Sequence, residues 1–258
     1  MKITFLGTGT SHGVPRIACN CPVCSSNDSK NKRLRSSVMI ENEKGDSLLI
    51  DPSFDFRQQA LKYNILEVEY VLVTHIHADH IFGLDELRIY NRLMKQPIQL
   101  YLSKKFDKRI KKIFTYIYNK PEQKGGGITS VKNNVIKPYS EFTIKNFKII
   151  PLKVKHGKIS IFGYRINNIA YITDTSLIIE ESFKYLESLD VLVINALRHR
   201  KHTTHFNLQD AIENSIRIGA KKTYFTHISH EIEHAGTSAN LPENIFLAYD
   251  GLVLDLNE

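Results

Sequence analysis

Four side chains able to bind metal ions are crowded into the segment Thr74-His75-Ile76-His77-Ala78-Asp79-His80. His75 and His77 are two residues apart, so both can point to the same side of an extended segment. Asp79 and His80 fall on the turn that follows. Imidazole together with carboxylate suits zinc, manganese or iron better than calcium or magnesium, which prefer oxygen ligands alone. The segment therefore predicts a metal site that can serve two neighbouring ions, rather than a polar loop with surface histidines.

All three cysteines lie within six residues, at Cys19, Cys21 and Cys24. An odd number of cysteines with none elsewhere cannot form a closed set of disulfides. Thiolates at this spacing can cover three corners of a zinc tetrahedron, and a fourth ligand must then come from elsewhere in the fold. A redox-sensitive thiol cluster is the alternative interpretation.

A second group of histidines lies in the segment 196–206, which includes His199, His202 and His205. The segment follows the apolar run 191–195 and precedes a helix that Asn207 is suited to cap, with Asp210 three residues later. We therefore expect these histidines on the same rim as the metal loop. Exposed loop histidines beside two arginines are the alternative.

The chemistry-bearing residues follow short apolar runs that are typical of buried strands. Tyr70 to Val73 precedes the histidine motif, and four other such runs end in an acidic residue or a histidine. These four ends are Asp51, His156, Asp174 and His227.

The H-x-H-x-D-H motif and the four strand ends, taken in order, resemble the metallo-β-lactamase superfamily over nearly the whole chain. The resemblance implies an α/β fold, an αββα four-layer sandwich, formed by residues 1–258 as a single hydrolase domain. It implies that Asp174 bridges two divalent ions, zinc or manganese, and that Asp51 orients ligands from behind. The other implied ligands are His75, His77 and His156 for one ion, and Asp79, His80 and His227 for the second.

The Gly-rich opening from Gly7 to Pro15, followed by the three cysteines, resembles one branch of that superfamily. This branch includes the phosphoribosyl cyclic phosphodiesterase of phosphonate breakdown. Its members hold a structural zinc with three cysteines and a late histidine, which makes His230 the candidate fourth ligand. The resemblance also implies that His205, helped by His202, acts on the phosphate or on the leaving group.

Alternating apolar and amphipathic segments predict two sheets packed face to face, with helices outside. The predicted strands are residues 3–7, 37–40, 48–51, 71–74, 98–102, 141–144, 147–155, 160–166, 169–173, 191–195 and 223–226. The predicted helices are residues 54–63, 85–94, 179–187 and 207–218. A further basic amphipathic helix is expected around residues 104–117, where a solvated face is favoured over a phosphate-backbone contact. The Lys124–Gly127 loop is either a lid or a surface connection.

Composition is consistent with a soluble cytoplasmic enzyme. Lys and Arg number 35 against 27 Asp and Glu, a formal charge of +8 that suits an anionic substrate. No stretch approaches the ~20 apolar residues of a membrane span, and no signal peptide is visible at the N-terminus. The expected partners are a small anionic phosphodiester and, in a homodimer, a second copy. Nucleic acid is the less favoured alternative, and no membrane contact is expected.

The inventory predicts hydrolysis by a water molecule that two divalent ions activate, with cyclic phosphodiesters of sugars or nucleotides as the first choice of substrate. Ribonuclease Z, which processes transfer RNA, uses the same metal motifs. A lactonase or thioester hydrolase would attack a carbonyl and have less need of the second histidine group. A non-catalytic binding module is disfavoured because every expected ligand is present.

Overall fold

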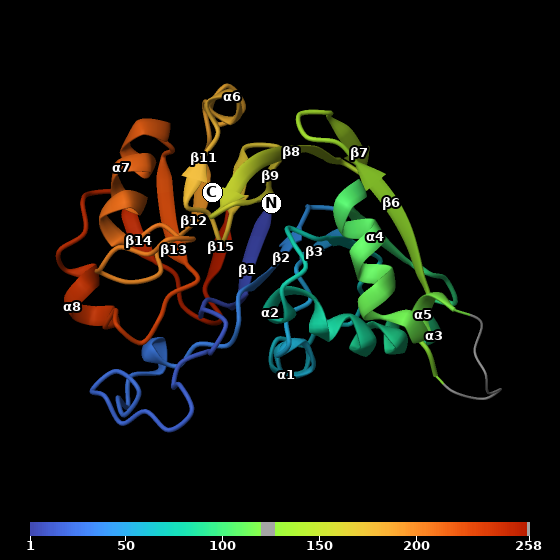
Figure 1. Ribbon diagram of the computed structural model, residues 1–258, viewed down its shortest axis with the longest axis horizontal. Helices are drawn as coiled ribbons and strands as arrows, with labels where there is room; N and C mark the ends of the chain where they lie inside the picture. The colour runs from blue at the N-terminus through green and yellow to red at the C-terminus, as the bar shows by residue number, and fades with distance from the viewer. Residues whose placement is uncertain (120–126, 257–258) are drawn as a thin grey trace.

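The computed structural model describes residues 1–119 and 127–256, and it places two β-sheets face to face with helices on their outer sides (Figure 1). This is the mixed α/β sandwich that the sequence predicts. No helix in these two ranges is both long enough and apolar enough to cross a bilayer.

The first sheet has seven strands in the order β15-β1-β2-β3-β4-β5-β6. Its strands are β1 (Lys2–Gly7), β2 (Ser37–Glu41), β3 (Ser47–Ile50), β4 (Tyr70–Leu72), β5 (Ile98–Ser103), β6 (Val131–Ile136) and β15 (Val253–Asp255). The helices of this half are η1 (Ser29–Asn31), α1 (Phe56–Lys62), α2 (Ala78–Ile81), η2 (Phe82–Leu87), α3 (Arg88–Met94), α4 (Lys104–Ile113) and α5 (Thr115–Tyr118).

The second sheet has eight strands, in the order β11-β8-β9-β10-β12-β13-β14 with β7 paired to β8. Its strands are β7 (Phe142–Ile144), β8 (Phe147–His156), β9 (Ile159–Ile166), β10 (Ile169–Ile172), β11 (Leu177–Ile178), β12 (Val191–Asn195), β13 (Lys222–Thr226) and β14 (Ile245–Leu247). The helices of this half are α6 (Glu180–Phe183), α7 (Leu208–Ile218) and α8 (His234–Ser238).

Side chains of alternating positions fill two separate cores. Along β3, Leu48 and Ile50 join the core between the sheets, whereas Leu49 faces the helices. Central parallel strands are covered on both faces, so β12 is buried at every position. This double coverage explains why such strands read as continuous apolar runs rather than as alternating patterns.

Several predicted elements differ from the structure in length. The basic helix expected over 104–117 is interrupted at Phe114, where the backbone (φ −105°, ψ 55°) is not helical, and it becomes α4 and α5. The helix expected over 85–94 begins earlier as a 3-10 segment, and the one expected over 179–187 keeps only Glu180–Phe183. Strand β6 was not predicted, because its sequence VKNNVI is polar and its order comes from parallel pairing with β5.

The loop that we weighed as a lid, Lys124–Gly127, lies outside the described residues except for Gly127. A role as a lid therefore stays a prediction.

Candidate metal centre and active site

The carboxyl ends of parallel strands bring the chemistry-bearing residues to one edge of the fold. β3 and β4 run parallel, as do β10, β12 and β13. Asp51 follows β3 and the histidine motif follows β4, while Asp174 and His227 follow β10 and β13. Side chains that leave the ends of neighbouring parallel strands converge in the crevice beyond those ends.

Three of these residues turn into the site through a left-handed backbone conformation. Asp51, Asp174 and His227 have φ values of 56°, 57° and 56°. This conformation costs an L-residue roughly 1–2 kcal/mol relative to a right-handed one, although Asp tolerates it better than most. The fold holds the side chains in place in spite of that cost.

The first group of candidate ligands consists of His75, His77, His156 and Asp174, with one ligand atom from each lying within 4.8 Å of the others. His75 Nε2 lies 3.0 Å from His77 Nδ1 and 3.9 Å from Asp174 Oδ2. His156 Nδ1 donates to the Thr204 carbonyl at 2.7 Å. That hydrogen bond fixes the ring and leaves its other nitrogen free to bind a metal ion.

The second group consists of Asp79, His80, Asp174 and His227, which meet the same 4.8 Å criterion. Asp174 Oδ1 lies 3.2 Å from His80 Nε2 and 3.2 Å from His227 Nε2. His80 Nε2 also lies 3.2 Å from Asp79 Oδ2. Asp174 thus belongs to both groups, with Oδ2 nearer the first and Oδ1 nearer the second.

Asp51 lies behind the second group and is fully buried. Its carboxylate accepts hydrogen bonds from the Thr74 backbone at 2.8 Å and the Thr74 hydroxyl at 2.6 Å. Asp51 Oδ2 also lies 2.7 Å from His80 Nδ1. The carboxylate therefore orients the His80 ring so that Nε2 points toward Asp79 and Asp174.

Buried nitrogen atoms without hydrogen bonds test whether this donor set fits metal ions. Among the described residues, His80 Nε2 and both ring nitrogens of His227 are buried and have no hydrogen-bond partner. His80 Nε2 and His227 Nε2 nevertheless face carboxylate oxygens, so donor atoms converge without bonding to each other. Imidazoles and carboxylates that converge in this way fit divalent metal ions.

The electrostatics differ between the two ligand groups. Burial lowers the pKa of His75 well below its ordinary value, and burial lowers the pKa of His156 to about 4. Burial opposes ionisation of Asp174, but His227 and His80 outweigh it and hold the pKa of this carboxyl well below its usual range. Burial also opposes a charge on His80, but Asp174, Asp79 and Asp51 outweigh it and raise the pKa of His80 well above its ordinary value. The first group therefore offers imidazole lone pairs at neutral pH, whereas a metal ion in the second group would displace a proton from His80.

A separate cluster joins the three cysteines to a histidine from the far end of the chain. The ligand atoms of Cys19, Cys21, Cys24 and His230 lie within 4.8 Å of one another. Cys19 Sγ and Cys21 Sγ lie 3.5 Å and 3.3 Å from His230 Nδ1. Backbone N–H groups of Arg16 and Cys24 point at two of the sulfurs, at 3.3 and 3.4 Å. Three thiolates and one imidazole suit tetrahedral zinc.

The second histidine group reaches the metal centre through one of its members. His205 Nε2 lies 3.1 Å from Asp174 Oδ2. On the other side of the ring, His205 Nδ1 lies 2.9 Å from the Thr204 hydroxyl and 3.2 Å from His202 Nδ1. His199, in contrast, is exposed at the surface of the same loop. The expected cap of the following helix is present, because Asn207 and Asp210 form a capping box.

A pocket of about 630 Å³ opens over the metal ligands. It is lined by Ser11, His77, Asp79, His156, Gly157, Lys158, Ile159, Asp174, Thr203, Thr204, His205 and His227. Ser11, Lys158 and Thr204 were not predicted as site residues, because each enters the site through a loop whose course depends on the fold. The available signal was proximity in sequence: Thr204 precedes His205, and Lys158 follows His156 by two residues.

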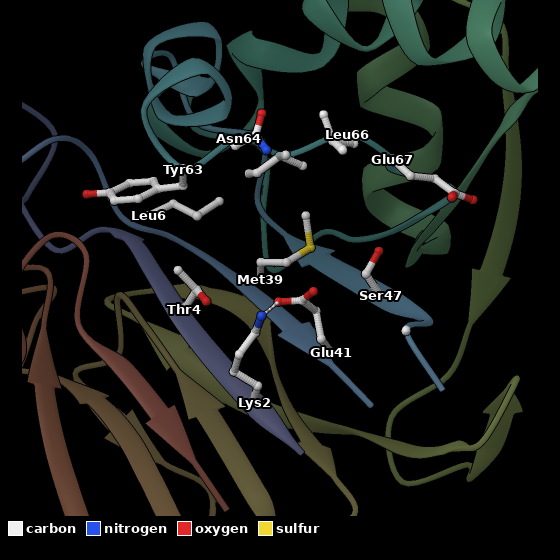
Figure 2. Close-up of a pocket in the computed structure, with 12 residues that line it drawn as sticks. Lys2, Thr4, Leu6, Met39, Glu41, Ser47, Tyr63, Asn64, Leu66 and Glu67 are labelled. Atoms are coloured by element: carbon white, nitrogen blue, oxygen red, sulfur yellow. Dashed lines mark ion pairs between the residues drawn. The ribbon is translucent and has the colours of Figure 1, made fainter. Parts of the chain in front are cut away.

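A second hollow, of about 330 Å³, lies on the outer face of the first sheet and holds none of the candidate ligands (Figure 2). Lys2 and Glu41 form an ion pair of 2.7 Å across its floor, and Leu6 and Met39 supply apolar surface (Figure 2). It contains no cluster of metal-ligating groups among the described residues. The chemistry therefore belongs to the pocket over Asp174.

Comparison with known proteins decides the family. Residues 47–228 match the model of the beta-lactamase superfamily domain. The chain belongs to the metallo-β-lactamase superfamily. The match begins before Asp51 and ends just after His227, so it contains both candidate ligand groups and leaves out the cysteine cluster. The His and Asp cluster within this fold supports the binding of divalent metal ions, and it is consistent with a metal-dependent hydrolase.

Two solved structures of the superfamily resemble this chain over nearly its whole length. A crystal structure described as a new diphosphatase from the PhnP family is 41% identical, with a TM-score of 0.91, and covers 98% of this chain and 96% of that one. Zinc-bound PqqB from Methylobacterium extorquens is 20% identical, with a TM-score of 0.80, and covers 99% of this chain and 100% of that one. At 20% identity, the similarity to PqqB shows a shared fold and nothing about activity.

A curated relative from Porphyromonas gingivalis, named octanoyltransferase, is 36% identical over 260 residues. The match covers 100% of this chain but 52% of that relative, so the chain spans about half the relative's length. An activity named for the whole of a longer protein does not follow for the half that this chain matches.

Proposed function

We propose that the protein is a phosphodiesterase that hydrolyses small cyclic phosphodiesters with the help of two divalent ions, zinc or manganese. The observation that carries this proposal is the shared position of Asp174. One of its oxygens faces each ligand group, and His205 approaches from the open side of the pocket. The likeness to a diphosphatase of the PhnP family supports chemistry at phosphorus.

In this proposal the side chains divide into those that hold the ions and those that act on the substrate. His75, His77 and His156 would hold one ion and Asp79, His80 and His227 the other, while Asp174 belongs to both ligand groups. Bound divalent ions in such a pair supply an activated water nucleophile and offset charge on the phosphoryl oxygens. Asp51 keeps His80 in its ligating orientation through the 2.7 Å hydrogen bond at Nδ1.

His205 is proposed to donate a proton to the departing oxygen. Its Nε2 faces Asp174 at the metal centre, and its Nδ1 faces the Thr204 hydroxyl on the other side of the ring. The centroid of the His205 ring lies 4.5 Å from that of His156. Thr204 and His202 contact Nδ1 and hold the ring in this orientation. A diester needs such an acid, because cleavage produces one alkoxide that leaves poorly without a proton.

The pocket suits a small anionic substrate. A volume of about 630 Å³ lies within the range of small-molecule sites. Lys158 lines the opening and forms no ion pair in the part of the chain that the structure describes. The formal charge of +8 adds a favourable field for anions.

A substrate panel tests the proposed function against its alternatives. We expect kcat/KM to be highest on cyclic phosphodiesters, compared with lactones, thioesters and structured RNA, all measured with metal-replete protein. A higher kcat/KM on a lactone or thioester would replace the proposal with carbonyl hydrolysis. A higher value on structured RNA would replace it with a ribonuclease Z-like activity.

Metal content is expected to be about three ions per chain, because the residues form two active-site groups and one cysteine–histidine group. Elemental analysis of metal-replete protein measures this directly. Cys24→Ser is expected to lower the content by about one ion and Asp174→Ala by one to two. A content near one in the unaltered protein would contradict the dinuclear site.

Substitution of His205 by alanine is expected to slow the hydrolysis of diesters with poor leaving groups by about a hundredfold or more. Diesters that release a nitrophenolate should be affected much less, because that anion needs no proton. Metal content and melting temperature should be unchanged, and His199→Ala in the same loop serves as the matched control. Equal losses on both kinds of substrate would contradict acid catalysis and leave His205 a positioning role.

A further inference from the structure

One face of the protein exposes an apolar patch as large as the largest that monomeric proteins usually carry. Six large apolar side chains on or beside α1, η2 and α3 each expose between 43% and 72% of their surface. They are Phe54, Leu61, Leu66, Phe82, Ile89 and Leu93. We call this surface the α1–α3 face; the two helices lie together below the first sheet in Figure 1.

The middle of the α1–α3 face is hollowed into a groove of about 310 Å³. Its lining includes Leu61 from α1, Leu66 from the loop after α1, and Ile89 and Leu93 from α3. Figure 2 shows the same loop from the neighbouring hollow, with Asn64, Leu66 and Glu67 along it. Phe54 and Phe82 extend the face, with ring centroids 6.5 Å apart.

The size of the α1–α3 face fits a protein partner rather than a small ligand. At about 150–200 Å² for each large side chain, the exposed fractions leave roughly 600 Å² of apolar surface. That value is at the upper end of the largest patches on monomers, about 300–600 Å². With a polar rim added, it approaches the ~800 Å² that each partner buries in a stable interface.

The charges on the groove favour a second copy of this chain as the partner. Arg57 on α1 and Glu86 on η2 are the charged residues that line it, and neither forms an ion pair within the described residues. A two-fold axis that brings each arginine opposite the glutamate of the other copy would form this ion pair twice, because every contact in an isologous interface is repeated. The groove carries no net charge, so two chains of formal charge +8 can meet there without repulsion at the contact.

We propose that two copies of the protein associate through their α1–α3 faces in a two-fold symmetric dimer, with Arg57 of each paired to Glu86 of the other. The interface lies directly beside the metal centre along the chain. Phe54 follows Asp51 by three residues, and Phe82 follows His80 by two. The two loops are tied together by a 3.0 Å hydrogen bond from Gly83 N–H to the Pro52 carbonyl. Association would therefore cover the outer side of the two loops that carry Asp51 and His80.

Sedimentation velocity or light scattering after gel filtration, at micromolar concentration, measures the mass. The unaltered protein should have twice the 29.7 kDa of one chain. The double variant Leu61→Glu, Leu93→Glu should have the mass of a single chain with an unchanged circular dichroism spectrum, because both side chains are exposed in one copy. Ile216→Glu, an equally exposed position on α7, is the matched control and should remain a dimer.

A single-chain mass for the unaltered protein would overturn the proposal, whatever other partner the face then binds. Persistence of the dimer in the double variant, or its loss in Ile216→Glu, would also overturn it. Charge exchange tests the pairing. Arg57→Glu and Glu86→Arg should each weaken association by about tenfold, and the two together should restore it. Failure of the combined variant to restore association would overturn the pairing of Arg57 with Glu86. None of these readouts depends on the substrate.

Discussion

Replacing Asp174 by alanine is expected to abolish hydrolysis, lowering kcat/KM by about three orders of magnitude or more. Among the described residues, this carboxylate is the one side chain that belongs to both ligand groups. Its Oδ1 lies 3.2 Å from both His80 Nε2 and His227 Nε2, and its Oδ2 lies 3.9 Å from His75 Nε2. Its removal would leave each ligand group one donor short and would take away the carboxylate that the two groups share. Turnover is measured with the same diester before and after substitution.

Two further variants separate this loss from an effect on the backbone. Asp174 has a φ of 57°, which alanine tolerates less well than aspartate does. Asp174→Asn preserves the shape and tolerates this conformation, yet it lacks the negative charge, so it should lose nearly as much activity. Asp190→Ala removes a surface carboxylate paired to Lys221 and should leave turnover unchanged. Retained turnover in both Asp174 variants would refute the dinuclear mechanism.

Cys21→Ser is expected to produce the largest loss of stability, because it removes a ligand from the cysteine–histidine cluster. Structural zinc sites contribute about 10–16 kcal/mol in zinc-finger peptides, which is as large as the 5–15 kcal/mol stability of a typical protein. Even a partial loss should lower the melting temperature by about 10 °C or more. Thermal unfolding followed by circular dichroism, with and without added zinc, measures the change.

The same variant should keep its turnover per folded molecule, because Cys21 does not line the pocket over Asp174. Ser25→Ala, which alters a neighbouring side chain outside the cluster, is the matched control. An unchanged melting temperature together with an unchanged zinc content in Cys21→Ser would show that the cluster is not a structural metal site.

The strands that carry the centre of this site could be predicted from short apolar runs. The runs before Asp51, His75, Asp174 and His227 form strands whose carboxyl ends meet, whereas the grouping of these residues as ligands came from the resemblance to a known superfamily. The cysteines and His230 are separated by about two hundred residues, and only the resemblance to a known branch paired them. Their approach to within 3.5 Å is a property of the whole fold.

Contacts made through loops could not be predicted in the same way. The Thr204 hydroxyl stands between His202 and His205, and its carbonyl accepts from His156, which is 48 residues away in the sequence. Nothing in local composition marks such a threonine. The interruption of the basic helix at Phe114 could not be predicted either, because Phe114 continues the apolar spacing of α4. In the structure its ring packs against Phe82, with ring centroids 5.8 Å apart, and this contact is not visible in the local sequence.

The left-handed backbone at Asp51, Asp174 and His227 leads us to expect that the stability of this protein depends on bound metal ions. Glycine would relieve the strain at all three positions, but glycine has no side chain with which to bind an ion or orient a ligand. Without metal the chain therefore carries a few kcal/mol of strain, a large share of the margin that keeps a typical protein folded. Ions that bind only the native state restore that margin by mass action. In a metal-poor cell, more of this protein would unfold and be degraded.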